Sequence, residues 1–191
     1  QAKKCTVYNV ALYHDKISFE TPLLGIEPSA IYTFIDEYPK LASNKKDAKS
    51  LSKNCYTVEE FLAQEIKSGN IKASQFHNDN KEIKIHSHCY QKALGNQVDT
   101  FHILNLPKNY KVKMMNTGCC GMAGSFGYEK EHFEISMKIG EERLFPSIRK
   151  TNSDTLIAAN GTSCRNQILD GTQRESYHPV TILKKALLAK D

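Results

Sequence analysis

The fold follows from one stretch near the middle of the chain, Lys81-Glu82-Ile83-Lys84-Ile85-His86-Ser87-His88-Cys89. Apolar Ile83 and Ile85 alternate there with polar neighbours, and this period of two indicates a β-strand. The predicted strand delivers His86, His88 and Cys89 to its carboxyl end. Side chains that bind metals or move protons therefore gather where one strand ends.

Strands and helices alternate on both sides of this stretch. Further strands are predicted at 23–26, 110–115 and 155–159. Helices are predicted at 2–13, after Pro28 with Ser29 as the N-cap as far as Tyr38-Pro39, at 57–68 behind a capping box, at 91–94, at 129–139, at 163–169 and from Pro179 to Leu187. The segment 44–52 is predicted to be a solvated turn or a short helix. This order predicts an α/β fold with a mainly parallel sheet flanked by helices.

A polar segment divides the chain into two predicted lobes. Periodicity is lost over 71–80, which is the predicted linker between a lobe at 1–70 and a lobe at 81–191. The lobes share a weak internal echo of strand, turn, serine and helix start, in Leu24-Gly25-Ile26-Glu27-Pro28-Ser29-Ala30 and Ile157-Ala158-Ala159-Asn160-Gly161-Thr162-Ser163-Cys164. If the two are pseudo-repeats, Ala30 occupies the position of Cys164.

Composition and charge argue against several classes of protein. The net charge of +5 comes from scattered lysines, and neither RNA-binding aromatic signatures nor zinc-finger spacings occur, so nucleic acid is not an expected partner. No apolar run approaches the ~20 residues that span a bilayer, and the first residues lack the order of a signal peptide. We expect a cytoplasmic protein, with peripheral membrane association left open. Because the chain begins at Gln1, we also expect a piece of a longer protein.

Six cysteines without a secretory signal favour metal or redox chemistry over disulfides. Three predicted strand ends lead into Cys89, Cys119-Cys120 and Cys164, and ligands of α/β sheets bind at such ends. Thiolates suit an iron-sulfur cluster or a zinc ion. Adjacent cysteines on an extended chain point in different directions, so a polynuclear cluster uses Cys119-Cys120 more readily than one zinc does. Buried inert thiols and a reactive redox pair are the alternatives.

Glycines punctuate the loop that carries the adjacent cysteines. They lie at Gly118, Gly121, Gly124 and Gly127. Glycine permits positive φ and close backbone approach, so the loop can wrap a cluster and point amides at its sulfurs. The alternative is a mobile turn before a helix.

Three motifs resemble the cysteine-rich CCG domain. They are His88-Cys89-Tyr90-Gln91-Lys92-Ala93-Leu94, Gly118-Cys119-Cys120-Gly121-Met122-Ala123-Gly124-Ser125-Phe126-Gly127-Tyr128-Glu129 and Gly161-Thr162-Ser163-Cys164-Arg165. That domain occurs in the heterodisulfide reductase B subunit, the glycolate oxidase iron-sulfur subunit and fused FAD/iron-sulfur D-lactate dehydrogenase-like oxidases, which this chain resembles most. The similarity covers nearly the whole chain, with 1–70 as a partial first half-repeat and 81–191 as the second repeat.

The resemblance implies electron transfer. In the family the domain carries a cysteine-ligated cluster that relays electrons from a flavin, often during oxidation of a 2-hydroxy acid such as lactate or glycolate. It implies an iron-sulfur cluster, expected as 4Fe-4S, on Cys89, Cys119, Cys120 and Cys164. The expected partner is a flavin-containing oxidase domain or subunit, because no dinucleotide fingerprint for FAD follows a predicted strand here. Whether this chain is an enzyme by itself is left open, and catalysis by the isolated piece is not expected.

Two departures from the family pattern leave other functions open. Ala30 stands where relatives commonly have Cys, and Gly161 stands where the heterodisulfide reductase version begins a Cys-x-x-Cys pair. Fewer ligands would give an altered cluster, a single cluster or none. The alternatives are a zinc-binding or metal-free scaffold for partner contact, and a thiol redox switch at Cys119-Cys120.

Histidines and one arginine complete the candidate site. His86 and His88 could bind a metal or move protons, although strand alternation predicts that Cys89 faces away from His88. Arg165 follows Cys164 at a helix start, where it would neutralise a negatively charged cluster unless it is an ordinary surface residue. Together with the four loop glycines, His88 and Arg165 are the predicted cofactor-contacting residues, whereas His178 is predicted to be a local hydrogen-bond partner.

Overall fold

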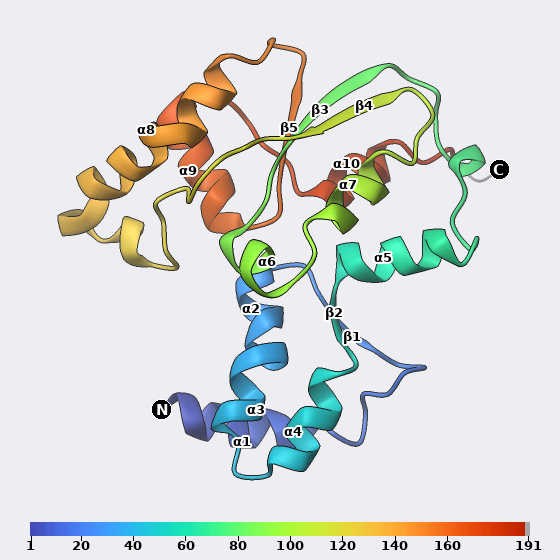
Figure 1. Ribbon diagram of the computed structural model, residues 1–191, viewed down its shortest axis with the longest axis vertical. Helices are drawn as coiled ribbons and strands as arrows, with labels where there is room; N and C mark the ends of the chain where they lie inside the picture. The colour runs from blue at the N-terminus through green and yellow to red at the C-terminus, as the bar shows by residue number, and fades with distance from the viewer. Residues whose placement is uncertain (190–191) are drawn as a thin grey trace.

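Parallel pairing joins the strands into two small sheets (Figure 1). In the smaller sheet β1 (Leu23–Gly25) pairs with β2 (Cys55–Thr57), and in the larger one β3 (Lys81–His86) lies between β4 (Tyr110–Met114) and β5 (Leu156–Ala159). The computed structural model describes residues 1–189, so the last two residues of the predicted 81–191 lobe lie outside the described part. The predicted α/β class, with parallel sheet flanked by helices, is confirmed.

Helices precede, connect and follow these strands. In chain order they are α1 (Ala2–Tyr13), α2 (Pro28–Tyr32), the π-helical turn η1 (Thr33–Glu37), α3 (Tyr38–Leu41), α4 (Lys45–Ser52), α5 (Val58–Lys67), the 3₁₀ turn η2 (Ala73–Gln75), α6 (Cys89–Leu94), α7 (Val98–Leu104), the 3₁₀ turns η3 (Phe126–Tyr128) and η4 (Lys130–His132), α8 (Phe133–Arg149), α9 (Thr162–Thr172) and α10 (Pro179–Lys185). Within residues 1–189, no helix combines the length and the apolar character that crossing a membrane requires.

The helix after β1 differs from its prediction at both ends. Glu27, rather than Ser29, is the N-cap, and Pro28 is the first helical residue, where its missing N–H costs no intrahelical hydrogen bond. The helix also continues past its predicted end, through η1 and α3 to Leu41. Pro39 does not stop it because it falls in the first turn of α3.

Other differences concern helices with weak local signals. The sequence did not predict α7, whose N-cap Gln97 makes no side-chain capping hydrogen bond. The helix predicted at 129–139 begins only at Phe133, after η4, and runs to Arg149. By contrast, the capping box is confirmed, since Thr57 and Glu60 exchange hydrogen bonds between side chain and backbone at 3.2 and 2.8 Å.

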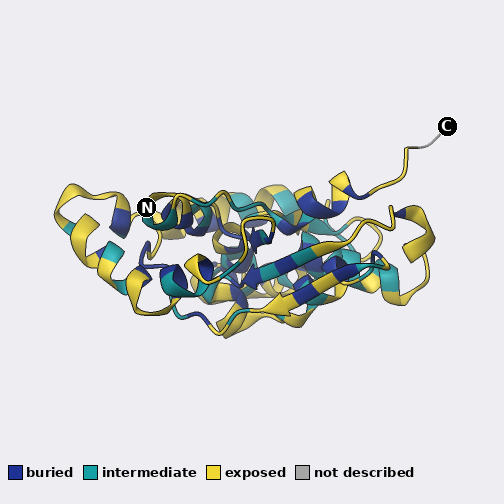
Figure 2. Cartoon of the chain, turned by 90° about the horizontal axis from the view of Figure 1, so that it is seen from above, coloured by how far each residue is buried: buried dark blue, intermediate teal, exposed yellow. Residues whose placement is uncertain are grey.

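Helices cover both faces of the larger sheet. Ile83 and Ile85 of β3 pack with Ala158 of β5 against α7 and α10. Ile157 and Ala159 of β5 point the other way and pack against α8 and α9, because successive side chains of a strand alternate between its faces. A third buried cluster holds α1 to α4 together in the first lobe. Figure 2 shows buried segments along the middle of the molecule and exposed residues on its outer turns.

Hydrogen bonds join the first lobe to the second. The backbone N–H of Thr162, at the start of α9, donates to Glu27 Oε2 at 2.8 Å. His178 Nε2 lies 2.9 Å from the carbonyl oxygen of Ile26. Phe76, within the predicted linker 71–80, is buried in the main core. The division into lobes at 71–80 stays a prediction, while the contacts show that the two parts pack directly on each other.

A carboxyl group is buried where α5 meets the loop between β5 and α9. Glu59 is 1% exposed, accepts a hydrogen bond from Asn160 Nδ2, and has its Oε1 3.4 Å from His178 Nε2. Removal of the carboxyl from water disfavours its charged form, and burial therefore raises the pKa of Glu59 to about 7.

We expect Ile85→Ala to lower the free energy of unfolding in urea by about 2–5 kcal/mol, because Ile85 is fully buried in the central strand and its loss leaves a cavity. The matched control is Lys113→Ala on the exposed side of β4, which should change this free energy by less than about 0.5 kcal/mol. Equal losses in the two variants would contradict the observed packing.

We expect Glu59→Gln to remove part of the pH dependence of stability. A raised carboxyl pKa stabilises the fold fully below the unfolded value near 4.5, and this contribution is lost as pH rises through about 7. Between pH 5 and pH 8, the free energy of unfolding in urea should therefore fall by about 2–3 kcal/mol more in the unaltered protein than in the variant. The exposed substitution Glu142→Gln is the control, and identical pH profiles for all three proteins would refute the assignment.

Candidate metal site

The three strands of the larger sheet deliver the four candidate cysteines. Strand β3 leads into α6, which begins at Cys89, and β5 leads into α9, whose first turn holds Cys164. Strand β4 leads into the loop that carries Cys119 and Cys120. Because β3 pairs in parallel with both neighbours, all three connections leave the sheet at the same edge. The prediction of cysteine loops at strand carboxyl ends is confirmed.

A cavity of about 470 Å³ lies at this edge, and all four thiols line it. The first lobe closes one side with Ser29 from α2. The full lining comprises Ser29, His88, Cys89, Tyr90, Cys119, Cys120, Met122, Ala123, Gly124, Ser163 and Cys164. None of the six cysteines of the chain forms a disulfide, and Cys5 and Cys55 lie outside the cavity.

The four thiols shift one another's pKa values. Interaction with Cys120 and Cys89 lowers the pKa of Cys119, and interaction with Cys120 and the nearby imidazole of His86 lowers the pKa of Cys164. The opposite effect falls on their neighbours, since interaction with Cys119 raises the pKa of both Cys89 and Cys120. The lowered pKa values favour the thiolate form of Cys119 and Cys164, which is the form that binds metals.

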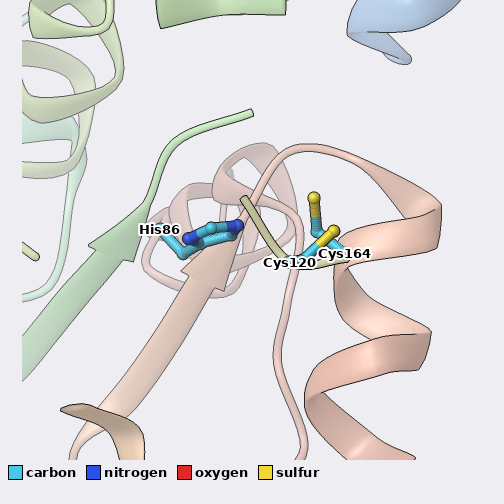
Figure 3. A group of neighbouring side chains, drawn as sticks. All are labelled: His86, Cys120 and Cys164. Carbon is cyan, nitrogen blue, oxygen red and sulfur yellow. The ribbon is translucent and has the colours of Figure 1, made fainter. Parts of the chain in front are cut away.

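The four thiols lie at different depths between the cavity mouth and the interior. Cys89 and Cys119 are half-buried, whereas Cys120 and Cys164 are 3% and 1% exposed. Beside the inner pair stands His86, which is fully buried, and one possible ligand atom from each of the three lies within 4.8 Å of the others. Figure 3 shows the His86 ring extending from the end of β3 toward Cys120 and Cys164. The inner end therefore offers two sulfurs and one nitrogen.

The loop before α8 owes its shape to Gly121. Its φ is +99°, and a Cβ there would lie 2.1 Å from the carbonyl oxygen of Ser136. In this conformation the backbone N–H of Gly121 donates to Cys119 Sγ at 3.3 Å. Of the other predicted glycines, Gly124 lines the cavity, while neither Gly118 nor Gly127 does.

His88 lies at the mouth of the cavity in a role that the strand pattern did not indicate. Strand β3 ends at His86, so His88 is the N-cap of α6, where its Nδ1 accepts the Tyr90 N–H at 3.2 Å. The expectation that Cys89 faces away from His88 by strand alternation is therefore wrong. The His88 ring packs against Gly161, where a Cβ would lie 2.5 Å from His88 Cδ2 and 3.3 Å from Cys164 Sγ.

Two basic residues near the cavity have roles that the sequence did not predict. Arg165 does not line the cavity, because its guanidinium donates to the carbonyl oxygens of Ala159 and Asn160 at 2.9 and 2.6 Å. Lys92 was not predicted, yet its Nζ donates to the carbonyl oxygens of Thr117 and Gly118 at 2.7 and 3.2 Å. Lys92 thus ties α6 to the loop that carries Cys119 and Cys120.

Some lining residues were not among the predicted site residues. Ser29 comes from the first lobe and was expected only as a helix N-cap, and Tyr90, within the motif that begins at His88, was given no role of its own. His86 did carry a signal, since alternation along β3 places its side chain on the face opposite Ile83 and Ile85, the face that packs against α8 and α9.

The fold and the site define a class of protein, namely a cysteine-rich α/β domain with a soft-donor cavity at the carboxyl edge of a parallel sheet. A buried set of thiols and imidazole is compatible with metal binding. No family model matches the chain, and no solved structure matches it.

Similarity to known proteins points to oxidoreductases. The chain is 24% identical over 188 residues to the C subunit of anaerobic glycerol-3-phosphate dehydrogenase from Escherichia coli K12, a match that covers 98% of this chain and 46% of that protein. It is 25% and 27% identical over 163 residues to D-2-hydroxyglutarate dehydrogenase of Pantoea ananatis and of Escherichia coli K12, covering 85% of this chain and 15% of those proteins. The resemblance to the CCG domain of oxidoreductases is confirmed, and the chain spans half or less of these relatives.

We expect Gly121→Ala to distort the cysteine loop, since φ of +99° and the Ser136 oxygen both oppose a Cβ. The variant should unfold at lower urea, by about 1–3 kcal/mol, and Cys119 and Cys120 should react faster with a thiol reagent. Gly118→Ala is the matched control in the same loop, because a Cβ there meets open space. A Gly118 variant as reactive as the Gly121 variant would contradict this account of the loop.

Proposed function

We propose that this chain is an electron-transfer domain of a larger FAD-linked oxidoreductase and that its cavity holds an iron-sulfur cluster, of the 4Fe-4S type, on Cys89, Cys119, Cys120 and Cys164. The observation that carries the proposal is the meeting of these four thiols, from three separate strand ends, in one cavity. Sequence similarity to two dehydrogenases supports an oxidoreductase context.

The residues present fit such a group. Four thiols provide the soft ligands that iron-sulfur clusters require. Two of them have lowered pKa values and are poised as thiolates, and the Gly121 amide already donates to Cys119 sulfur. When bound, an iron-sulfur cluster supplies reversible one-electron transfer.

In this proposal, residues at different depths in the cavity have different roles. Burial of Cys120 and Cys164 excludes water from the inner end, where solvent exposure would alter a reduction potential. Half-buried Cys89 and Cys119 form the outer end, the side open to an electron donor. The Gly121 amide and the Lys92 side chain hold the loop that carries Cys119 and Cys120.

Substrate and flavin chemistry belong, in this proposal, to the remainder of a larger enzyme. The two kinds of relative are named for glycerol-3-phosphate and D-2-hydroxyglutarate, and the chain covers 46% and 15% of them. We infer that a flavin-containing domain or subunit oxidises a 2-hydroxy acid or a similar alcohol and passes electrons to this cavity. Lactate and glycolate are candidate substrates within that class.

A zinc site is the second candidate, and one observation favours it. His86, Cys120 and Cys164 present three ligand atoms within 4.8 Å, a donor set that suits one tetrahedral zinc ion. With zinc the domain would be a structural scaffold for partner contact. Metal analysis separates the candidates, because only the iron-sulfur proposal requires acid-labile sulfide.

We expect anaerobically reconstituted protein to contain stoichiometric iron and acid-labile sulfide and to give a low-temperature EPR signal on reduction. Cys119→Ser should lose or alter that signal, because a hydroxyl is a poor ligand for a soft metal. Cys5→Ser, at an exposed position in α1, is the control and should leave it unchanged. Stoichiometric zinc without sulfide would support the scaffold, and metal-free protein would contradict both candidates.

A further inference from the structure

The His86 side chain carries an unusual combination of burial and an unused nitrogen. Its relative exposure is 0%, and Nε2 has no hydrogen-bond partner among the described residues. Leaving a buried polar atom unsatisfied is destabilising, so such an atom calls for a specific explanation. Simple core packing does not provide one, since an apolar side chain would fill the space without that cost.

The other ring nitrogen is held in place. His86 Nδ1 lies 2.7 Å from Thr117 Oγ1, which is also buried. If Nδ1–H donates to this hydroxyl oxygen, Nε2 keeps a free lone pair. Histidines that bind metals show this arrangement, in which the second ring nitrogen donates to an outer partner that fixes the tautomer and the ring orientation.

The free nitrogen stands beside the inner thiols. A ligand atom of His86, Cys120 Sγ and Cys164 Sγ all lie within 4.8 Å of one another, a spacing at which three atoms can surround a single ion (Figure 3). The three residues come from β3, the cysteine loop and α9, so the tertiary fold alone brings them together. They are the buried end of the cavity, where a ligand set is shielded from water.

We propose that His86 Nε2 is a metal ligand at the inner end of the cavity, beside Cys120 and Cys164, so that the bound centre has both nitrogen and sulfur ligands. This inference rests on the proposed function in one respect, namely that the cavity holds a metal. Imidazole nitrogen adds a neutral ligand to the thiolates, so the bound centre carries less negative charge than it would with cysteines alone. Thr117 is then a positioning residue.

His88 provides an internal contrast. Its Nδ1 accepts the backbone N–H of Tyr90, so the proton of the neutral ring is on Nε2. That ring serves as a helix cap, and its free nitrogen carries a hydrogen rather than a lone pair. The two histidines flanking Ser87 are thus assigned different roles, and only His86 is set up as a nitrogen donor.

The first test is pulsed EPR on the anaerobically reconstituted, reduced protein, labelled with ¹⁵N-histidine. We expect a histidine nitrogen that is strongly coupled to the electron spin of the metal centre, and this coupling can be measured in the unaltered protein. His86→Asn should abolish it, because Asn places its amide near the Nδ1 position and can still reach Thr117. His77→Asn, at an exposed histidine, is the matched control and should retain it.

A second test uses Co²⁺ alone, so that it does not depend on cluster assembly. We expect Co²⁺ to bind the unaltered protein with sulfur-to-metal charge-transfer absorption, and His86→Asn and Thr117→Val each to weaken binding by about 10-fold or more. If iron and sulfide assemble but no histidine nitrogen is coupled, the ligand assignment is refuted while the proposed function stands. If no cluster forms, the proposed function fails, and the cobalt affinities decide on His86 alone: unchanged affinities refute it, and the expected losses support it.

Discussion

Parallel pairing of β3 with both of its neighbours is the constraint on which the rest of the structure depends. Three strands in parallel register send three connections out of one edge, and those connections carry Cys89, the adjacent pair Cys119 and Cys120, and Cys164. Antiparallel pairing of either neighbour would move its cysteines to the opposite edge. Helices on both faces bury the sheet, so the pairing is fixed by packing as well as by hydrogen bonds.

Solvent exposure decreases from the mouth of the cavity to its inner end. Cys89 and Cys119 lie near the mouth, where the first lobe contributes Ser29, and Cys120 and Cys164 lie beside the buried imidazole of His86. The contact between Glu27 and the start of α9 holds the first lobe against the helix that carries Cys164. A carboxylate at a helix N-terminus interacts favourably with its N–H groups and dipole. The relative position of the lobes and the geometry of the cavity are therefore linked.

Local sequence predicted the elements correctly where it contained a specific signal, such as a capping motif or an alternation of apolar and polar residues. The capping box at Thr57 and the alternation in β3 both correspond to observed elements. Prediction failed where packing decides. The N-cap residue of α7 makes no side-chain capping hydrogen bond, and the helix is stabilised by burial of residues such as Ile103. The helix after Pro28 continued because proline is tolerated in a first turn.

The amino-acid sequence alone determined the parallel α/β alternation and the placement of four cysteines at strand ends, because strand period, turn residues and capping are properties of neighbours along the chain. Which side chains meet at those ends was decided by tertiary packing. Tertiary packing places His86 beside Cys120 and Cys164. It also lets Arg165 donate to backbone oxygens and Lys92 donate to the loop that carries the adjacent cysteines. These outcomes depend on distances between residues far apart in the chain, and local patterns do not specify such distances.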